Sequence, residues 1–111
     1  MNLKNHRQSQ SIDVPWWLYV IECQGGGLYV GISKDVLARY EKHAQGKGAM
    51  YTRLNRPVRL LCQLEYSNHQ KAAHAECQIK KMSREKKIEW LLFNEKMAMA
   101  VNQGSVPLAQ R

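Results

Sequence analysis

The sequence predicts an α+β domain in which a small three-stranded antiparallel sheet is flanked by helices, in the order β-β-α-β-α-α. Three observations support this prediction. Two runs of aromatic and β-branched residues lie on either side of a glycine cluster, a third run alternates apolar and polar residues, and three segments have the spacing of amphipathic helices. Strands and helices mixed in this order are typical of helices packed on one sheet.

The first two strands are expected to form a hairpin. Residues 16–23 read WWLYVIEC and residues 28–32 read LYVGI, with QGGG at 24–27 between them. A loop of this length suits a β-hairpin. Because the first strand is apolar on both faces, we expect it at the centre of the sheet.

Alternation places Trp17, Tyr19 and Ile21 on one face of the first strand. In the second strand Gly31 is flanked by β-branched residues. A glycine inside a strand indicates either a bulge or a close approach of another group to the backbone.

The first helix is predicted over VLARYEKHA, residues 36–44, with Ser33 or Asp35 as its N-cap and Gly46 as its C-terminal stop. Arg39 lies on a neighbouring stripe with Asp35 and His43. The predicted apolar stripe comprises Val36, Leu37, Tyr40 and Ala44.

A basic loop is expected over residues 46–57, followed by a half-exposed strand, VRLLCQLEY. Ser67 and Gln70 fit a capping box before a helix over roughly residues 71–82. Ser83 is expected to cap a third helix that ends near Phe93. The predicted inward face of the strand comprises Val58, Leu60, Cys62, Leu64 and Tyr66.

The chain of 111 residues fits one domain, which we place at residues 14–94. We expect a disordered tail at 1–13 and a C-terminal extension or tail at 95–111, where apolar periodicity is lost. Seventeen lysines and arginines against nine acidic residues give a net charge of +8, which suits a polyanionic partner.

The cysteines argue against a disulfide framework or a structural zinc site. There are three of them, Cys23, Cys62 and Cys77, and no pair has CxxC spacing. Reduced thiols indicate a cytoplasmic protein. No apolar run is long enough to span a bilayer, so we expect no membrane partner.

Glu76 is the most unusual residue of the second predicted helix, because it falls within the apolar arc of Ala72, Ala75 and Ile79. Burying a carboxylate is costly unless it is paired or binds a cation. Taken alone, the position favours a salt bridge with Arg39 or Lys80. Together with the two tyrosines and Arg39, it supplies groups suited to cutting a phosphodiester.

These residues resemble a GIY-YIG nuclease domain, and in particular its small stand-alone bacterial (YhbQ-like) members. The triplet at residues 18–20, LYV, stands at the GIY position, and the triplet at 29–31, YVG, stands at YIG. The stretches GKGAMYTRLNRPVRLL and AECQIKKMSR also resemble those members. The resemblance covers about residues 16–94.

The resemblance implies a metal-dependent DNA endonuclease. Because no separate DNA-reading domain accompanies it, we expect structure-directed or weakly sequence-specific cutting. DNA repair and recombination are candidate settings, and mobile-element and defence roles also stay open. The resemblance implies one Mg²⁺ or Mn²⁺ ion, which Glu76 would hold. We expect no small-molecule cofactor and action as a monomer or weak homodimer. The catalytic set that the resemblance implies is Tyr19, Tyr29, Arg39, His43 and Glu76, supported by Gly31 and Asn94. The expected nucleic-acid contacts are Lys47, Tyr51, Arg53 and Lys80.

Some alternatives stay open from the sequence. Either Tyr19 or Tyr29 could be the general base, with the other orienting the attacking water. His43 could share a proton with Tyr19 or be a surface histidine. Met50 stands where those small members usually carry lysine, and the first triplet lacks both Gly and Ile. These departures favour, as the alternative, a nucleic-acid-binding module with little or no activity.

Overall fold

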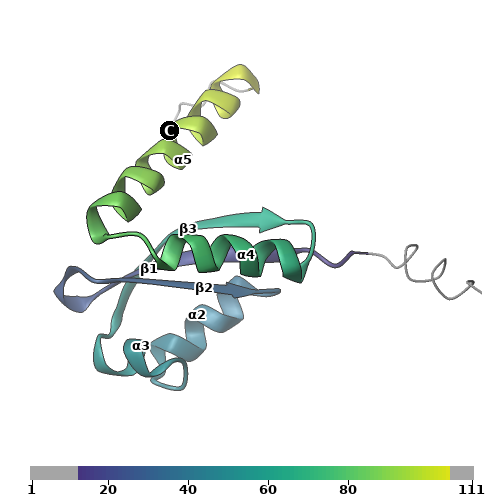
Figure 1. The fold of residues 1–111 in the computed structure, drawn as a ribbon. Coiled ribbons are helices and arrows are strands. Elements are labelled where there is room, and N and C mark those ends of the chain that lie inside the picture. Colours follow the sequence, from purple (N-terminus) through teal and green to yellow (C-terminus); the bar gives the residue numbers. More distant parts are fainter. Residues whose placement is uncertain (1–12, 106–111) are drawn as a thin grey trace, which may run out of the picture.

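The computed structural model describes the backbone of residues 13–105 and the side chains of residues 13–95. Its sheet has β1 (Trp16–Cys23) at the centre, between β2 (Leu28–Ser33) and β3 (Pro57–Tyr66), and both pairings are antiparallel (Figure 1). The predicted α+β class and the central place of the first strand are confirmed. Apart from Asp13, the tail expected at residues 1–13 lies outside the described residues.

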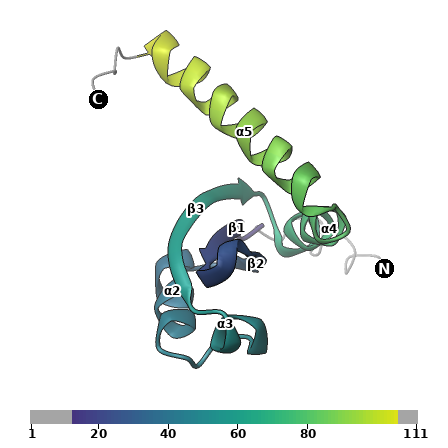
Figure 2. The same cartoon turned by 90° about the vertical axis from the view of Figure 1, so that its left-hand side faces the viewer.

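The helices are divided between the two faces of the sheet. One face carries α2 (Val36–Ala44) and α3 (Met50–Leu54), and the other carries α4 (His69–Lys80) (Figures 1 and 2). The last helix, α5 (Arg84–Ser105), follows α4, and its Trp90 and Leu91 pack against the core on the α4 face (Figures 1 and 2). Of the helices that the structure describes, none is both long and apolar enough to cross a membrane.

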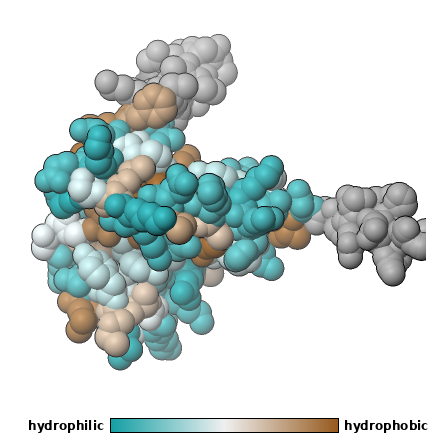
Figure 3. All heavy atoms as spheres, in the orientation of Figure 1, coloured by the Kyte–Doolittle hydropathy of each residue, from teal (hydrophilic) through white to brown (hydrophobic). Residues whose placement is uncertain are grey.

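The core consists of two clusters, one on each face of β1. Alternation along β1 sends successive apolar side chains to opposite faces, which explains why this strand carries apolar residues on both faces. The buried members are Leu18, Val20, Val30 and Ile79 on the α4 face, and Tyr19, Ile21, Cys23 and Val36 on the α2 face. Hydrophilic side chains dominate the outer surface of α4 (Figure 3).

The turn between β1 and β2 depends on glycine. It forms a short 3₁₀ helix, η1 (Gln24–Gly26), in which Gly25 and Gly26 both have φ of +88°. The Cys23 N–H donates to the Gly27 carbonyl at 2.9 Å and closes the turn. Residues other than glycine rarely adopt this backbone conformation.

Both ends of α2 agree with the prediction. The Asp35 carboxylate accepts a hydrogen bond from the Ala38 N–H at 3.1 Å, which makes Asp35 the N-cap. Gly46 has φ of +80°, and its N–H donates to the His43 carbonyl at 3.1 Å. This is the left-handed C-terminal stop that glycine favours.

The predicted apolar stripe of α2 is wrong at Leu37, which is 68% exposed. The inward face is formed instead by Val36, Tyr40 and His43, and His43 is completely buried. These residues follow the i, i+4, i+7 spacing of one helix face. The inward face of α2 therefore includes His43, whereas hydrophobicity alone predicts Leu37 there.

The segment between α2 and β3 also departs from the prediction, because the expected basic loop contains α3. In β3, Ile21 pairs with Leu60 while Val20 pairs with Cys62, so Leu61 is an extra residue that forms a bulge. Leu60 therefore packs on the α2 face and Cys62 on the α4 face, and their predicted common face is wrong.

The second predicted helix begins earlier than expected, at His69, and its cap is Asn68 rather than Ser67. The Asn68 side-chain oxygen accepts a hydrogen bond from the Lys71 N–H at 2.9 Å. The Ser67–Gln70 capping box is therefore wrong by one residue. Asparagine at this position satisfies an N–H group that the helix itself leaves free.

Replacing Asn68 with alanine is expected to destabilise the protein by about 1 kcal/mol, since it removes this cap. Urea denaturation of Asn68→Ala and Ser67→Ala provides the comparison, and Ser67→Ala should leave the free energy of unfolding nearly unchanged. A larger loss in Ser67→Ala would instead support the capping box.

The cap predicted for the last helix is confirmed, because the Ser83 hydroxyl accepts a hydrogen bond from the Lys86 N–H at 3.2 Å. The helix continues to Ser105, well beyond Phe93, and so occupies most of the region expected as a C-terminal extension. Cys23, Cys62 and Cys77 are free thiols in the structure, and Cys23 is buried.

Candidate active site

Two tyrosines lie together on the α2 face of the sheet. Tyr19 pairs with Gly31 across the hairpin, and Tyr29 pairs with Ile21, so both phenols project to the same side. Their ring centroids are 6.3 Å apart. Tyr19 is 1% exposed, whereas Tyr29 is only half-buried.

Gly31 makes room for the Tyr19 ring. A Cβ atom at Gly31 would lie 2.5 Å from Tyr19 Oη and 2.6 Å from Cζ, far closer than van der Waals contact. The pairing of β1 with β2 continues through Gly31 without a register shift. Of the two sequence interpretations, close approach is therefore right and a bulge is wrong.

His43 is the centre of a buried hydrogen-bonded chain. Its Nε2 lies 3.0 Å from Tyr19 Oη, and its Nδ1 lies 2.7 Å from Thr52 Oγ1. The Thr52 hydroxyl donates to the Ala49 carbonyl at 2.9 Å. The alternative of a surface histidine is wrong, because these partners on β1 and α3 satisfy both ring nitrogens.

The environment shifts the acidity of both members of the Tyr19–His43 pair. Burial, with a smaller contribution from Tyr29, raises the pKa of Tyr19 to about 12, although the Arg39 guanidinium acts in the opposite direction. Burial, and then the charge of Arg39, lowers the pKa of His43 below 6.5. Near neutral pH the resting pair is therefore a neutral phenol beside a neutral imidazole.

The lowered pKa of His43 predicts a pH dependence of stability. Below its unfolded pKa of 6.5 the unfolded chain binds the proton more readily than the native protein. The neutral His43 ring therefore makes its full contribution to the stability of the folded protein above pH 6.5. This contribution is lost as the pH falls through the lower pKa that His43 has in the native protein. The midpoint of thermal unfolding should fall with acidification more steeply in the native sequence than in His43→Gln. His74→Gln, at an exposed position on α4, is the control, and equal slopes in all three would contradict the prediction.

Glu76 and Lys80 lie on α4, and the Lys80 side chain reaches Tyr29 on β2, one of the two edge strands. Their side chains form an ion pair of 3.2 Å, and Glu76 is 22% exposed. Lys80 Nζ lies 6.0 Å from the centre of the Tyr29 ring. Lys80 is thus the partner found for Glu76, in agreement with one of the two salt bridges considered from the sequence. A partly exposed pair of this kind contributes little to stability, typically about 0.3–0.5 kcal/mol.

Arg39 completes the group from α2. It is half-buried, and its guanidinium lowers the Tyr19 pKa. The negative charge of Glu76 acts on the same phenol in the opposite direction. The structure thus brings together the five residues that the sequence singled out, which are Tyr19, Tyr29, Arg39, His43 and Glu76.

The donor set at Glu76 fits a weakly chelated divalent ion. Among the side chains that the structure describes, no group of three or more His, Cys, Asp or Glu residues could hold a metal. Mg²⁺ commonly binds through one or two carboxylates, substrate phosphates and several waters. A single carboxylate therefore suits such an ion better than zinc, which requires more protein ligands.

Two of the four predicted nucleic-acid contacts lie beside Tyr29. The Tyr51 ring stacks on Tyr29 with a centroid distance of 6.2 Å and an interplanar angle of 21°, and Tyr51 is 40% exposed. Lys80 is the second of these contacts, because its Nζ lies over the Tyr29 ring. Lys47 and Arg53 are exposed in the segment that contains α3.

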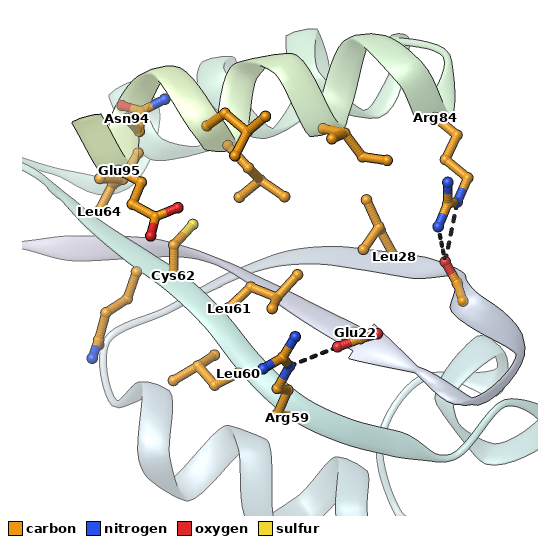
Figure 4. Close-up of a pocket in the computed structure, with 15 residues that line it drawn as sticks. Glu22, Leu28, Arg59, Leu60, Leu61, Cys62, Leu64, Arg84, Asn94 and Glu95 are labelled. Atoms are coloured by element: carbon orange, nitrogen blue, oxygen red, sulfur yellow. Dashed lines mark hydrogen bonds and ion pairs between the residues drawn. The ribbon is translucent and has the colours of Figure 1, made fainter. Parts of the chain in front are cut away.

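Asn94, expected to support the site, lies elsewhere. Its Nδ2 donates to the Trp90 carbonyl at 2.8 Å, one turn back in α5. The side chain lines a groove of about 680 Å³ between α5 and β3, together with Cys62, Leu64 and Glu95 (Figure 4). The expected role of Asn94 at the site is therefore corrected, because α5 places its side chain over β3.

Sequence reasoning missed Thr52 and two glycines. A Cβ atom at Gly48 would collide with the His43 ring, and one at Gly27 would collide with the Tyr51 hydroxyl. Together with Gly31 beside Tyr19, three glycines therefore each make room for one aromatic ring of the site. The available signal was the family-like stretch GKGAMYTRLNRP, which contains both Gly48 and Thr52.

Comparisons with known proteins match this part of the chain. The family model of the GIY-YIG catalytic domain matches residues 15–89. A UPF0213 protein of Xanthomonas axonopodis pv. citri is 42% identical over 77 residues, or 69% of this chain and 76% of that protein. One from Cupriavidus necator is 44% identical over 77 residues, or 69% of this chain and 84% of that protein.

A solution NMR structure of a UPF0213 protein from Bacillus halodurans is also similar. It is 37% identical, covers 71% of this chain and 84% of its own, and has a TM-score of 0.48. The segment matched by the family model contains the five clustered residues and ends before Asn94.

Proposed function

Because the chain belongs to the GIY-YIG catalytic-domain family, we propose that it is a metal-dependent endonuclease that hydrolyses phosphodiester bonds in DNA. The proposal rests chiefly on one observation. At the β2 edge, an accessible phenol, a buried phenol–imidazole pair, an arginine and a carboxylate lie around one surface. The net charge of +8 suits a polyanionic substrate.

Hydrolysis requires an attacking water, an acceptor for its proton and positive charge beside the phosphate. Arg39 supplies a planar guanidinium that matches phosphate oxygens. Lys80 is 51% exposed and paired with Glu76. It lies close enough to Tyr29 to contact the phosphate that Arg39 would bind. These two cations would counter the charge that develops in the transition state.

Glu76 is the residue that would hold the metal. Its carboxylate is the acidic oxygen donor of the cluster, and it remains 22% exposed. Mg²⁺ or Mn²⁺, when bound, acts as a Lewis acid that stabilises charge on a phosphoryl oxygen. With Glu76 engaged in this way, Lys80 would be available to contact phosphate.

The two phenols have different surroundings, and we assign them different roles. Tyr29 is half-buried between Tyr51 and the Lys80 side chain, so it orients the water and substrate. Tyr19 lies against the His43 Nε2 at 3.0 Å, so it is the phenol with a proton acceptor at hand. We therefore assign the general base to Tyr19.

Recognition of DNA is expected to depend on its backbone rather than on its sequence. Lys47 and Arg53 are exposed cations, and the Tyr51 ring is accessible for stacking. Contacts of these kinds give affinity and strong salt dependence but little base readout. We therefore propose structure-directed or weakly sequence-specific cutting.

The test is incubation of the purified protein with supercoiled, branched and single-stranded DNA, each with Mg²⁺, with Mn²⁺ and with EDTA. Cleavage should require the metal and should be strongly reduced in Tyr29→Phe. Tyr66→Phe, on the α4 face of the sheet, is the matched control and should cleave normally. Equal cleavage by all three proteins would indicate a contaminating nuclease. Salt-sensitive binding without cleavage would favour the binding module.

A further inference from the structure

Tyr19 as a base raises a difficulty, because its pKa is about 12 and it is protonated near neutral pH. A neutral phenol accepts a proton from water only if it gives up its own at the same time. The buried chain from Tyr19 through His43 to Thr52 and Ala49 provides a direction for that transfer. The direction depends on which nitrogen of His43 carries the hydrogen.

Two arrangements of hydrogens fit the distances. In the first, Thr52 donates to the Ala49 carbonyl, His43 Nδ1–H donates to Thr52, and Tyr19 donates to the bare Nε2. In the second, Thr52 donates to Nδ1, and Nε2–H donates to Tyr19. A hydroxyl has one hydrogen and an imidazole nitrogen is either donor or acceptor, so the choice at Thr52 fixes the rest of the chain.

The second arrangement leaves two faults. The Thr52 oxygen and the Ala49 carbonyl oxygen would face one another at 2.9 Å with no hydrogen between them. Tyr19 would accept from His43, and its own buried hydrogen would have no acceptor among the side chains hydrogen-bonded to it. A buried donor left unpaired is costly, whereas the first arrangement pairs every donor.

We propose that Thr52 is a positioning residue that holds His43 in the Nδ1–H tautomer, so that Nε2 accepts the hydrogen of Tyr19. The Tyr19 oxygen then presents only lone pairs to Arg39 and to the attacking water. This inference rests on the proposed nuclease function for its catalytic consequence, but the tautomer itself does not depend on that function.

The water O–H bond breaks as its proton passes to Tyr19 Oη, while the Tyr19 proton passes to His43 Nε2. The water oxygen bonds to phosphorus, the bond to the leaving oxygen breaks, and that oxygen takes a proton from solvent. His43 holds two protons until Nε2 returns one to solvent through Tyr19. Throughout this cycle Thr52 keeps the Nδ1–H in place.

The variants Thr52→Val and Thr52→Ser test the role of the hydroxyl. Valine keeps the branched shape of threonine but lacks the hydroxyl, and serine retains it. We expect Thr52→Val to lower kcat on the order of 10- to 100-fold with KM nearly unchanged, by comparison with other residues that orient a histidine. Thr52→Ser should recover most of the rate. Leu54→Ala, at a 75% exposed position of the same helix, should leave kcat unchanged.

The tautomer of His43 is read directly by ¹⁵N NMR of the imidazole in the full chain. The native protein should show a protonated Nδ1 and a bare Nε2, and Thr52→Val should shift the population toward Nε2–H. An Nε2–H tautomer in the native protein, or an unchanged tautomer in Thr52→Val, would overturn the proposal. If the native protein does not cleave DNA, the nuclease assignment fails, and the NMR result still decides whether Thr52 sets the tautomer.

Discussion

Glu76→Gln is expected to reduce metal-dependent DNA cleavage by about 10³-fold while leaving the fold intact. A metal bound at the phosphate contributes several kcal/mol of transition-state stabilisation, and each 1.36 kcal/mol corresponds to about a factor of ten in rate. Glutamine keeps the size of the side chain but removes the charge that would hold the ion. The ion pair with Lys80 is partly exposed, so its loss should change stability very little.

The matched control is Glu89→Gln. Glu89 also pairs with a lysine on its own helix, at 3.9 Å from Lys86, but it is 70% exposed on α5. Single-turnover cleavage of a labelled DNA should be unchanged in this variant. DNA binding measured in the absence of metal should be preserved or stronger in Glu76→Gln, because the substitution removes a negative charge from the protein surface that faces the DNA. Normal cleavage by Glu76→Gln would mean that the residue is only an ion-pair partner of Lys80.

The aromatic part of the site could be predicted from the sequence because it depends on local rules. Alternation with period two fixes which residues of a strand share a face, so Tyr19 was placed on the face of Trp17 and Ile21. The apolar character of both faces placed β1 at the centre of the sheet. Glu76 was conspicuous because a carboxylate within an apolar arc needs a partner, and the structure supplies Lys80.

The burial of His43 could not be predicted in the same way. On the helix alone, Leu37 is the better candidate for the inward face, and yet it is 68% exposed. A histidine is buried at little cost only when both ring nitrogens are paired, and here the partners come from β1 and α3. Those partners are distant in sequence, so no local pattern contains them. The bulge at Leu61 is similar, because it is defined by pairing with β1.

Gly31→Ala is expected to impair both stability and activity. The added Cβ would lie 2.5 Å from Tyr19 Oη, and the ring has no free space because Tyr19 is 1% exposed. Overpacking of this kind costs about 1–3 kcal/mol. Relief of the clash must move the Tyr19 hydroxyl relative to His43 Nε2, and a displacement of about 1 Å in a reacting group lowers rates by about 10²-fold. Both losses should appear in one variant.

Gly46→Ala separates these two effects. Gly46 has φ of +80° and open space around its Cβ position, so alanine there is strained but touches nothing in the site. The strain costs about 1–2 kcal/mol, similar to the clash at Gly31. Urea denaturation should therefore show comparable losses in the two variants, while kcat falls only in Gly31→Ala. Equal loss of kcat in both would mean that activity simply follows stability. Native kcat in Gly31→Ala would mean that the Tyr19–His43 distance does not control the reaction.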